Sequence, residues 1–449
     1  MQDWNQVFLE SYNRLNSQQK QAVDSIEGVV VVNAGPGTGK TQLLSLRVAN
    51  ILRLSDIAPY NILCLSFSEA AARNMRERLT SLIGGSARQI NIFTYHGFGN
   101  EIINQYPDYF FEGLQRQPID DVRRQQIVRK IFKDLPFDHE LNILDPNKTF
   151  IYLKPTLELI SNLKKNGISS TDYSRILTRN EECLIPIQKV ISEFFESFVG
   201  ARVSNKILEA LPIFLDQIIA IQTQVDLKEA NLETNNFVQL GSNLELQFKQ
   251  EIKQMVELCL EISKTKPFTE WKDKFLTKND EDKFVISELV KIGKQKAVVK
   301  IYEQYQESLN ENSLYDFEDM LMEVNLKLEH PIKKALKYNL QEKYQYILVD
   351  EFQDTNGVQL RLLQNLVDTA INEGNPNLLV VGDPDQAVYK FQGALNNNLA
   401  LLLEAFTDAK IVNLNTNYRS NQDILDLAFS VIEESTDRLK TNKLLEFKL

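Results

Sequence analysis

A glycine-rich segment, NAGPGTGKT (residues 33–41), lies between an apolar run and a stretch with helical periodicity. It fits the pattern G-x-x-x-x-G-K-[ST] when the pattern starts at Ala34, which then stands in place of the first glycine. Backbone N–H groups of such a loop, with the N-terminus of the following helix, bind phosphate oxygens. The spacing therefore predicts a nucleotide phosphate loop; the alternative is a strand-to-helix turn without a ligand. The loop residues expected to contact nucleotide are Ala34, Gly35, Pro36, Gly37, Thr38 and Gly39.

The next two residues of the loop, Lys40 and Thr41, carry groups that suit a nucleotide with its metal ion. Lys40 is expected to reach the β- and γ-phosphates, and the Thr41 hydroxyl is expected to bind Mg²⁺. Such a site takes a second Mg²⁺ contact from the end of a neighbouring strand. The segment YILVDEFQDTNG supplies Asp350 for that contact, and Glu351 beside it is placed to act as general base toward water. Solubility is the alternative explanation for these acids.

Short β-rich runs form two clusters, GVVVVNAG, NILCLSFS and INIFTYHG in the first, and YQYILVDE, NLLVVGDP and AKIVNLN in the second. Each is nearly continuously apolar, as is typical of parallel strands covered by helices on both faces. Helical patterns such as TQLLSLRVANILRL and EAAARNMRERLTSLI lie between them. This alternation predicts an α/β fold with a doubly wound parallel sheet.

Between about residues 100 and 340, Gly and Pro are sparse, and stretches such as LELQFKQEIKQMVELCLEI have helical periodicity. Lys40 and Asp350 are 310 positions apart (350 − 40), far more than one nucleotide-binding domain requires. If both belong to one site, the helical stretch is a large all-helical insertion into the α/β domain. Two unrelated domains in tandem are the alternative.

The composition limits the class of protein. The 449 residues, of which 43% are hydrophobic and 25% charged, indicate a globular protein of two or three domains. A net charge of −11 argues against a globally basic nucleic-acid-binding protein, although it allows a locally basic groove. Three scattered cysteines and three scattered histidines fit neither a disulfide framework nor a structural metal. The N-terminus lacks a signal-peptide pattern, and no apolar run approaches ~18 residues, so we expect a cytoplasmic protein without membrane contact.

Taken in order, the motifs resemble those of superfamily 1 DNA helicases of the UvrD/Rep/PcrA family. LNSQQKQAV resembles the Q motif, NAGPGTGKT the Walker A motif, LSFSEAAARNMRERL motif Ia and FTYHGFG motif Ib. LYDFEDML is similar to the acidic-aromatic segment before the Walker B strand, and ILVDEFQDTN resembles motif II, which is Walker B. VVGDPDQAVYKFQGA resembles motif III, and LNTNYRS motif IV. The resemblance implies a RecA-like P-loop NTPase sheet, ATP and Mg²⁺ as cofactors, and single-stranded DNA as partner.

The resemblance also assigns roles to nucleotide-site residues. Gln19 would read the adenine edge, and Tyr418 would stack on the adenine. Arg419 would act as an arginine finger toward the transferring phosphoryl group, and Gln386 would contact the γ-phosphate region. Gln42 stands where the family commonly has Arg, so packing on the adenine is expected to be weaker. In motif II, Gln353 and Asp354 are expected to organise the hydrogen bonds of the turn.

For single-stranded DNA, the resemblance implies a groove whose aromatic faces stack bases, each worth about 1–3 kcal/mol. The groove residues are Phe67, Thr94, Tyr95, His96, Tyr389, Phe391 and Gln392. Core packing is the alternative for Phe67, as it is for Phe98. Glu69-Ala70 replaces the Asn-Lys pair of motif Ia, and Gln392 replaces an Arg of motif III, so fewer ionic contacts with DNA are expected.

The resemblance predicts how the chain divides into domains. The first RecA-like domain (1A) would comprise residues 1–98 and 344–413, with an enlarged 1B-like helical insertion over 99–343. The segment ISNLKKNGIS within the insertion resembles 1B. Residues 414–449 would begin the second RecA-like domain (2A). Only 30 residues follow Arg419 (449 − 419), and motifs V and VI are not found, so we expect an N-terminal portion that is weakly active alone.

Three functions are compatible with these patterns. The leading hypothesis is an ATP-dependent DNA helicase or translocase that moves 3′ to 5′ on single-stranded DNA as a monomer, with repair or recombination proteins among its partners. The second is the motor part of an AddA/RecB-like helicase–nuclease. The third is a non-motor ATP-binding switch module, in which motifs Ia, Ib and III would have no role.

Overall fold

The computed structural model describes residues 4–110, 116–197, 204–221, 240–279, 281–331, 334–367, 376–386 and 398–432. The chain forms two compact units. Unit 1 comprises Met1–Pro118, Lys164–Gly167 and Tyr315–Leu449, and unit 2 comprises Ile119–Leu163 and Ile168–Leu314. The helical stretch that we expected over residues 99–343 is therefore shared between the two units.

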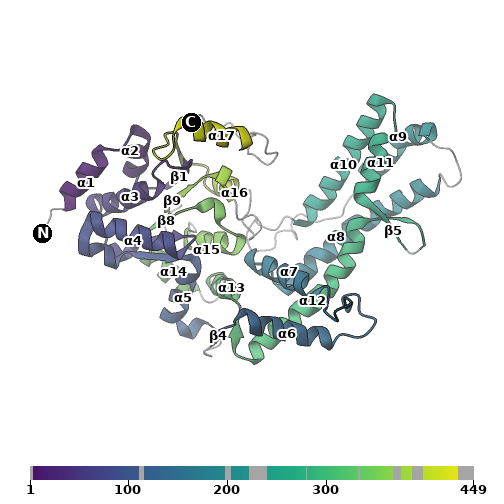
Figure 1. Cartoon of the computed structure of the whole chain (residues 1–449), viewed down its shortest axis with the longest axis horizontal. Helices are drawn as coiled ribbons and strands as arrows, with labels where there is room; N and C mark the ends of the chain where they lie inside the picture. The colour runs from purple at the N-terminus through teal and green to yellow at the C-terminus, as the bar shows by residue number, and fades with distance from the viewer. Residues whose placement is uncertain are drawn as a thin grey trace. The chain divides into compact units, whose positions relative to one another are not determined.

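A six-stranded sheet forms the centre of unit 1, and each pair of neighbouring strands runs parallel (Figure 1). The strand order is β10-β1-β9-β8-β2-β3. All six runs predicted as strands are confirmed as members of this sheet. They are β1 (Val29–Ala34), β2 (Ile62–Ser66), β3 (Asn91–Thr94), β8 (Tyr346–Val349), β9 (Asn377–Gly382) and β10 (Lys410–Leu414).

One face of the sheet is covered by the first four helices of the chain (Figure 1). These are α1 (Trp4–Asn13), α2 (Ser17–Asp24), α3 (Lys40–Leu54) and α4 (Glu69–Ile83). Alternate strand residues such as Val30 and Val32 pack into the apolar core beneath these helices, because side chains alternate between the two faces of a strand. The predicted helices over residues 41–54 and 69–83 are confirmed as α3 and α4.

A second group of helices in unit 1 packs together around α13. It consists of α5 (Tyr95–Gln105), α13 (Phe317–Leu328), α14 (Lys334–Lys343) and α15 (Gly357–Val367). In this group α5 contacts β2 and β3, while α13 contacts α5, α14 and α15. Unit 1 also contains β4 (Gln117–Pro118), α16 (Asn398–Ala405) and α17 (Gln422–Ile432). The strand β4 pairs with β7 (Leu314–Tyr315), which lies at the boundary between the two units in the sequence.

Unit 2 is mainly helical among its described residues, and an apolar core joins its helices. Its helices are α6 (Asp121–Lys133), α7 (Leu153–Lys165), α8 (Ser170–Glu196), α9 (Ser204–Ala220), α10 (Leu240–Ile262), α11 (Lys266–Phe275) and α12 (Ser287–Glu311), the last residues of α7 belonging to unit 1. A short antiparallel pair, β5 (Leu276–Lys278) and β6 (Phe284–Ile286), completes it. Of the described helices, none is long and apolar enough to cross a membrane.

The direction of the strands determines where chemistry can be placed. Because all six strands of the sheet are parallel, the loops that follow them leave from the same edge. The segments after all six strands contain most of the residues that we singled out in the sequence. The sheet therefore brings together side chains that are hundreds of positions apart in the chain.

Candidate nucleotide-binding site

The loop between β1 and α3 turns through two glycines in the left-handed region, Gly37 at φ 69° and Gly39 at φ 87°. Residues with a side chain rarely adopt these values. Gly37 is further constrained because a Cβ there would lie 2.8 Å from the Cβ of Arg419. The Thr38 hydroxyl donates to the Gly35 carbonyl at 2.8 Å and so closes the turn. The loop has the compact form that a phosphate-binding loop requires.

Gln19, which we expected to read adenine, is buried next to this loop. Its Oε1 accepts a hydrogen bond from the backbone N–H of Asn16 at 3.1 Å, as part of a capping box that begins α2. Its Nε2 donates to the Thr38 carbonyl at 2.9 Å. Both ends of the amide are thus used within the protein, and in this structure Gln19 joins α2 to the phosphate loop.

Glu351 follows β8 in a left-handed conformation, with φ 50° and ψ 48°. A non-glycine residue in this region is strained and persists where surrounding contacts hold it, most often at functional sites. Its Oε2 lies 2.9 Å from Nζ of Lys40 and accepts a hydrogen bond from Nε2 of Gln353 at 2.8 Å. Oε1 of Gln353 in turn accepts from the backbone N–H of Asp383 at 2.9 Å. Gln353 therefore organises this turn, as expected, and links it to the end of β9.

Asp350 directly follows β8 and is only 4% exposed. Its Oδ1 accepts a hydrogen bond from the backbone N–H of Glu351 at 3.0 Å. Burial, and then the charge of Glu351, raise the pKa of Asp350 to about 6. The same two causes raise the pKa of Asp354 to about 6, and burial raises the pKa of Asp383. These carboxylates lie in a region where additional positive charge would stabilise their ionised forms.

Two residues predicted to bind Mg²⁺, Thr41 and Asp350, carry oxygen donors. This cation prefers oxygen ligands, and the Thr41 hydroxyl and the Asp350 carboxylate are both of that kind. Asp354 has a buried carboxylate oxygen, Oδ1, without a hydrogen-bond partner among the described residues. A bound divalent cation would place positive charge beside these carboxylates and so stabilise their ionised forms.

A pocket of about 390 Å³ opens above the loop. Except for Arg78, every residue that lines it was predicted from the sequence to bind nucleotide or act in catalysis. The lining residues are Pro36, Gly37, Thr38, Gly39, Lys40, Thr41, Gln42, Arg78, Glu351, Gln386, Tyr418 and Arg419. The structure thus brings the phosphate loop, motif II, motif III and motif IV to one cavity, while Gln19, Ala34, Gly35 and Asp350 lie outside its lining.

The segment after β10 is seated directly on the phosphate loop. The backbone N–H of Tyr418 donates to the Gly37 carbonyl at 2.9 Å, and the Asn417 side chain donates to the Pro36 carbonyl. The Tyr418 hydroxyl accepts from the side chain of Asn16 at 2.9 Å. With its hydroxyl held in this way, Tyr418 remains 61% exposed and lines the pocket. This arrangement suits a ring that packs on a flat base.

Arg78 lines the pocket but was not predicted from the sequence to be a site residue. It lies on α4, exposed to solvent, and reaches the same pocket as Gln42. The sequence carried no signal for this role, because an arginine on the polar side of an amphipathic helix is ordinarily a solvated charge. Only the packing of α4 beside α3 brings it to the nucleotide site.

The residues predicted to contact DNA follow β2 and β3 at the same sheet edge. Phe67 and His96 are half-buried, whereas Tyr95 is 2% exposed and its ring is not available to a nucleic acid base in this structure. The Thr94 hydroxyl caps α5 and donates to the Glu69 carboxylate at 2.8 Å. Phe98 is buried in the core, which confirms the core packing that we considered for it. Tyr389, Phe391 and Gln392 lie outside the described residues.

His96 has an aromatic neighbour that was not predicted to contact DNA. Its ring stacks on Phe317 with centroids 4.0 Å apart and planes inclined by 25°. Phe317 is 57% exposed. Burial, and secondarily the charge of Lys165, lower the pKa of His96 to about 4, so the imidazole is neutral at pH 7. The pair thus presents an uncharged aromatic surface next to the ends of β2 and β3.

Replacement of Asp350 by Asn should stabilise the protein at pH 7.5 when neither nucleotide nor Mg²⁺ is added. The folded-state pKa of about 6 exceeds the ordinary value of 3.8, so the ionised carboxylate destabilises the folded state above pH 6. Asp350→Asn should raise the free energy of unfolding by about 3 kcal/mol at pH 7.5, and the gain should fall toward zero near pH 4. Urea unfolding at both pH values measures this, with exposed Asp408→Asn as control. An equal gain at both pH values would contradict the electrostatic explanation.

Comparisons with known proteins bear on this site. The family model described as the UvrD/REP helicase N-terminal domain matches residues 15–407. The chain is 26% identical over 424 residues to the ATP-dependent DNA helicase PcrA of Staphylococcus epidermidis, covering 94% of this chain and 40% of that protein. It is 26% identical over 426 residues to PcrA of Staphylococcus aureus, covering 95% and 41%. The chain thus spans about two-fifths of the length of these curated relatives. With its phosphate loop, motif II turn and motif IV segment around one pocket, the chain belongs to the UvrD/REP helicase N-terminal domain family.

Proposed function

We propose that this chain is the ATP-binding and DNA-contacting part of an ATP-dependent DNA helicase or translocase that acts on single-stranded DNA in the 3′ to 5′ direction. One observation carries the proposal: the phosphate loop, the Lys40–Glu351 pair, Tyr418 and Arg419 meet at one pocket on the edge of a parallel sheet. Membership of the UvrD/REP family supports it, as do the relatives named ATP-dependent DNA helicases. In this proposal unit 1 contains the first RecA-like domain.

The pocket suits ATP with its triphosphate along the loop and its base toward Tyr418. The Lys40 ammonium carries three donors, and its contact with Glu351 leaves others for phosphate oxygens. Thr41 and Asp350 would hold Mg²⁺, which supplies charge neutralisation to the phosphates. Arg419 and Gln386 line the same cavity and would stabilise charge on the transferring phosphoryl group.

Glu351 is the residue that we assign as general base. Its carboxylate is half-exposed and oriented by two donors, Lys40 and Gln353, so that it faces the pocket. A carboxylate held at this position can accept a proton from water that attacks the γ-phosphate. Because Gln353 also binds the end of β9, the position of the base depends on the segment that contains motif III.

Single-stranded DNA would lie along the ends of β2 and β3. Phe67, His96 and Phe317 provide partly exposed aromatic surface there, and aromatic faces stack bases without selecting sequence. Tyr95 and Thr94 would support this surface from within the core and the α5 cap.

Glu351→Gln should lower ATP turnover by about 10²–10⁴-fold with nucleotide affinity nearly unchanged, because it removes the base but keeps the shape of the side chain. Lys40→Ala should instead lower nucleotide affinity by about tenfold or more, since a phosphate contact is lost. Binding of a fluorescent ATP analogue and steady-state hydrolysis, each with and without single-stranded DNA, measure both effects.

The same measurements can contradict the proposal. Wild-type protein that binds no ATP would overturn the assignment of the pocket. ATP binding that DNA does not affect, together with no DNA binding, would favour a switch module over a helicase or translocase.

Arg78→Ala should weaken ATP binding by about threefold to tenfold. A guanidinium at a partly exposed aromatic or anionic ligand contributes about 0.5–1.5 kcal/mol. Arg73→Ala is the matched control, because Arg73 is an exposed arginine on the same helix that does not line the pocket. Equal effects of the two substitutions would show that Arg78 acts only through general charge.

A further inference from the structure

Two helices of unit 1, α5 and α13, approach closely and begin side by side. Gly99 on α5 makes this approach possible, because a Cβ there would lie 2.8 Å from Cδ2 of Leu321 and 3.4 Å from Sδ of Met320 on α13. In their first turns, His96 of α5 and Phe317 of α13 form the stacked pair. The orientation of the exposed Phe317 ring therefore depends on how the first turn of α13 is held.

That turn is held by a buried lysine from a distant part of the chain. Lys164 is 0% exposed, and no other lysine among the described residues is classed as buried. Its Nζ lies 2.7 Å from Oδ2 of Asp316 and 2.8 Å from Oδ1 of Asp319. Lysine is almost never fully buried unless it is paired, and here two carboxylates provide the pairing.

The two acids form the cap of α13. Asp316 is the N-cap residue, its side chain accepts from the backbone N–H of Asp319, and Oδ2 of Asp319 accepts from the backbone N–H of Asp316 at 2.9 Å. The helix dipole favours negative charge at this end, but two buried carboxylates repel each other. Lys164 offsets that repulsion. Phe317 is the residue directly after the N-cap, so the ion cluster fixes the backbone from which its ring projects.

The segment that supplies Lys164 is itself anchored in unit 1. Lys164–Gly167 belongs to this unit, although the residues on either side belong to unit 2. Asn166 packs against Gly357, where a Cβ would lie only 3.0 Å from the Asn166 Cα. Gly167, with φ 70°, lies near Val358. The segment thus contacts the first turn of α15 as well as that of α13.

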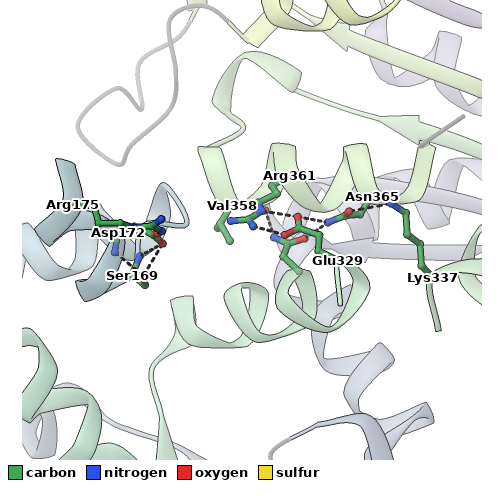
Figure 2. A network of polar contacts seen from close by, with 9 residues as sticks. Ser169, Asp172, Arg175, Glu329, Lys337, Val358, Arg361 and Asn365 are labelled. Atoms are coloured by element: carbon green, nitrogen blue, oxygen red, sulfur yellow. Dashed lines mark hydrogen bonds and ion pairs between the residues drawn. The ribbon is translucent and has the colours of Figure 1, made fainter. Parts of the chain in front are cut away.

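The other end of α13 is also tied to α15. The C-cap residue Glu329 accepts hydrogen bonds from Arg361, at 2.6 Å from Nε, and from Asn365 at 3.0 Å (Figure 2). Asn325 donates to the Val358 carbonyl at 2.9 Å. With both α13 and Lys164–Gly167 fixed to α15, the ammonium of Lys164 has a defined position relative to the α13 cap.

We propose that Lys164 is a positioning residue for nucleic acid binding: through Asp316 and Asp319 it holds the first turn of α13 so that the Phe317 ring, stacked on His96, presents a face to a base. This inference rests on the proposed function. Lys164 belongs to the ISNLKKNGIS segment, and in this proposal it supports the DNA-binding surface without contacting DNA itself.

A DNA-free experiment tests the positioning. Phe317→Trp places a fluorescent ring on the surface. Because the parent protein already contains Trp4 and Trp271, the fluorescence of the new ring is obtained by subtracting the spectrum of the parent. Adding Lys164→Met should alter the emission and acrylamide quenching of that ring, because its backbone is released. Lys154→Met, on the exposed part of the same helix, should leave both unchanged. An unchanged signal in the folded Lys164→Met protein would overturn the inference.

A double-substitution cycle tests the consequence for DNA. We expect Lys164→Met to weaken binding of a fluorescein-labelled oligothymidylate by about tenfold, a value within the range for loss of one stacked base, while ATP-analogue affinity changes less than about twofold. In a Phe317→Ala background the additional loss should nearly vanish, whereas in a Phe67→Ala background it should persist. A general loss of structure would weaken binding equally in both backgrounds, and that result would contradict the inference.

Lys164→Met leaves two buried acids uncompensated, so it can fail to fold. The triple variant Lys164→Met, Asp316→Asn, Asp319→Asn removes all three charges while Asn keeps the capping acceptors. We expect it to fold, with DNA binding still weakened because the bridge is absent; wild-type DNA affinity would overturn the proposal. If wild-type protein binds no oligothymidylate, the proposed function fails, and the tryptophan signal alone decides whether Lys164 positions residue 317.

Discussion

The parallel direction of the sheet is the constraint on which the rest of unit 1 depends. A parallel strand delivers its following loop to the same edge as its neighbours, so the phosphate loop after β1, the acids after β8 and the aromatic residues after β2 and β3 must lie along one border. Within that border the order of strands decides which groups meet. Since β9 lies between β1 and β8, Asp383 at its end can bind Gln353 and thereby join two motifs.

Charge at this border is unevenly distributed. Three buried acids with raised pKa values lie close to Lys40, which also pairs with Glu351. Such a cluster costs folding stability, and a protein with no use for a cation would gain stability by replacing it with neutral groups. Strain at Glu351 adds to the same cost. Both features are understandable if the site is built to bind a metal–nucleotide complex, because the ligand then stabilises the charges that the fold concentrates.

The nucleotide pocket and the aromatic surface share structural support. The α15 helix starts soon after the motif II turn, and its residues hold both the C-terminal end of α13 and the segment that carries Lys164. The first turn of α13 in turn carries Phe317. Rigid elements with buried polar connections are a means by which two binding surfaces keep a defined geometry. Here the connections are specific ion pairs and hydrogen bonds rather than apolar contacts alone.

Local pattern was sufficient to predict the strands, α3 and α4, and the phosphate loop with Glu351, whereas Gln386, Tyr418 and Arg419 were assigned from the family resemblance. Short, nearly continuous apolar runs bounded by turn residues are typical of buried strands. The glycine spacing of residues 33–41 is compatible with few backbone conformations. Gly37 and Glu351 could be predicted as site residues because the residues adjacent to them in the sequence complete the motif. By contrast, Arg78, Phe317 and Lys164 lie in helical sequence whose periodicity says only which face is polar. Their partners are distant in the chain, as with Lys164 and Asp316, which are 152 positions apart. Only the packing of helices against one another decides such contacts, because burial and charge pairing are properties of the folded neighbourhood and not of the local sequence.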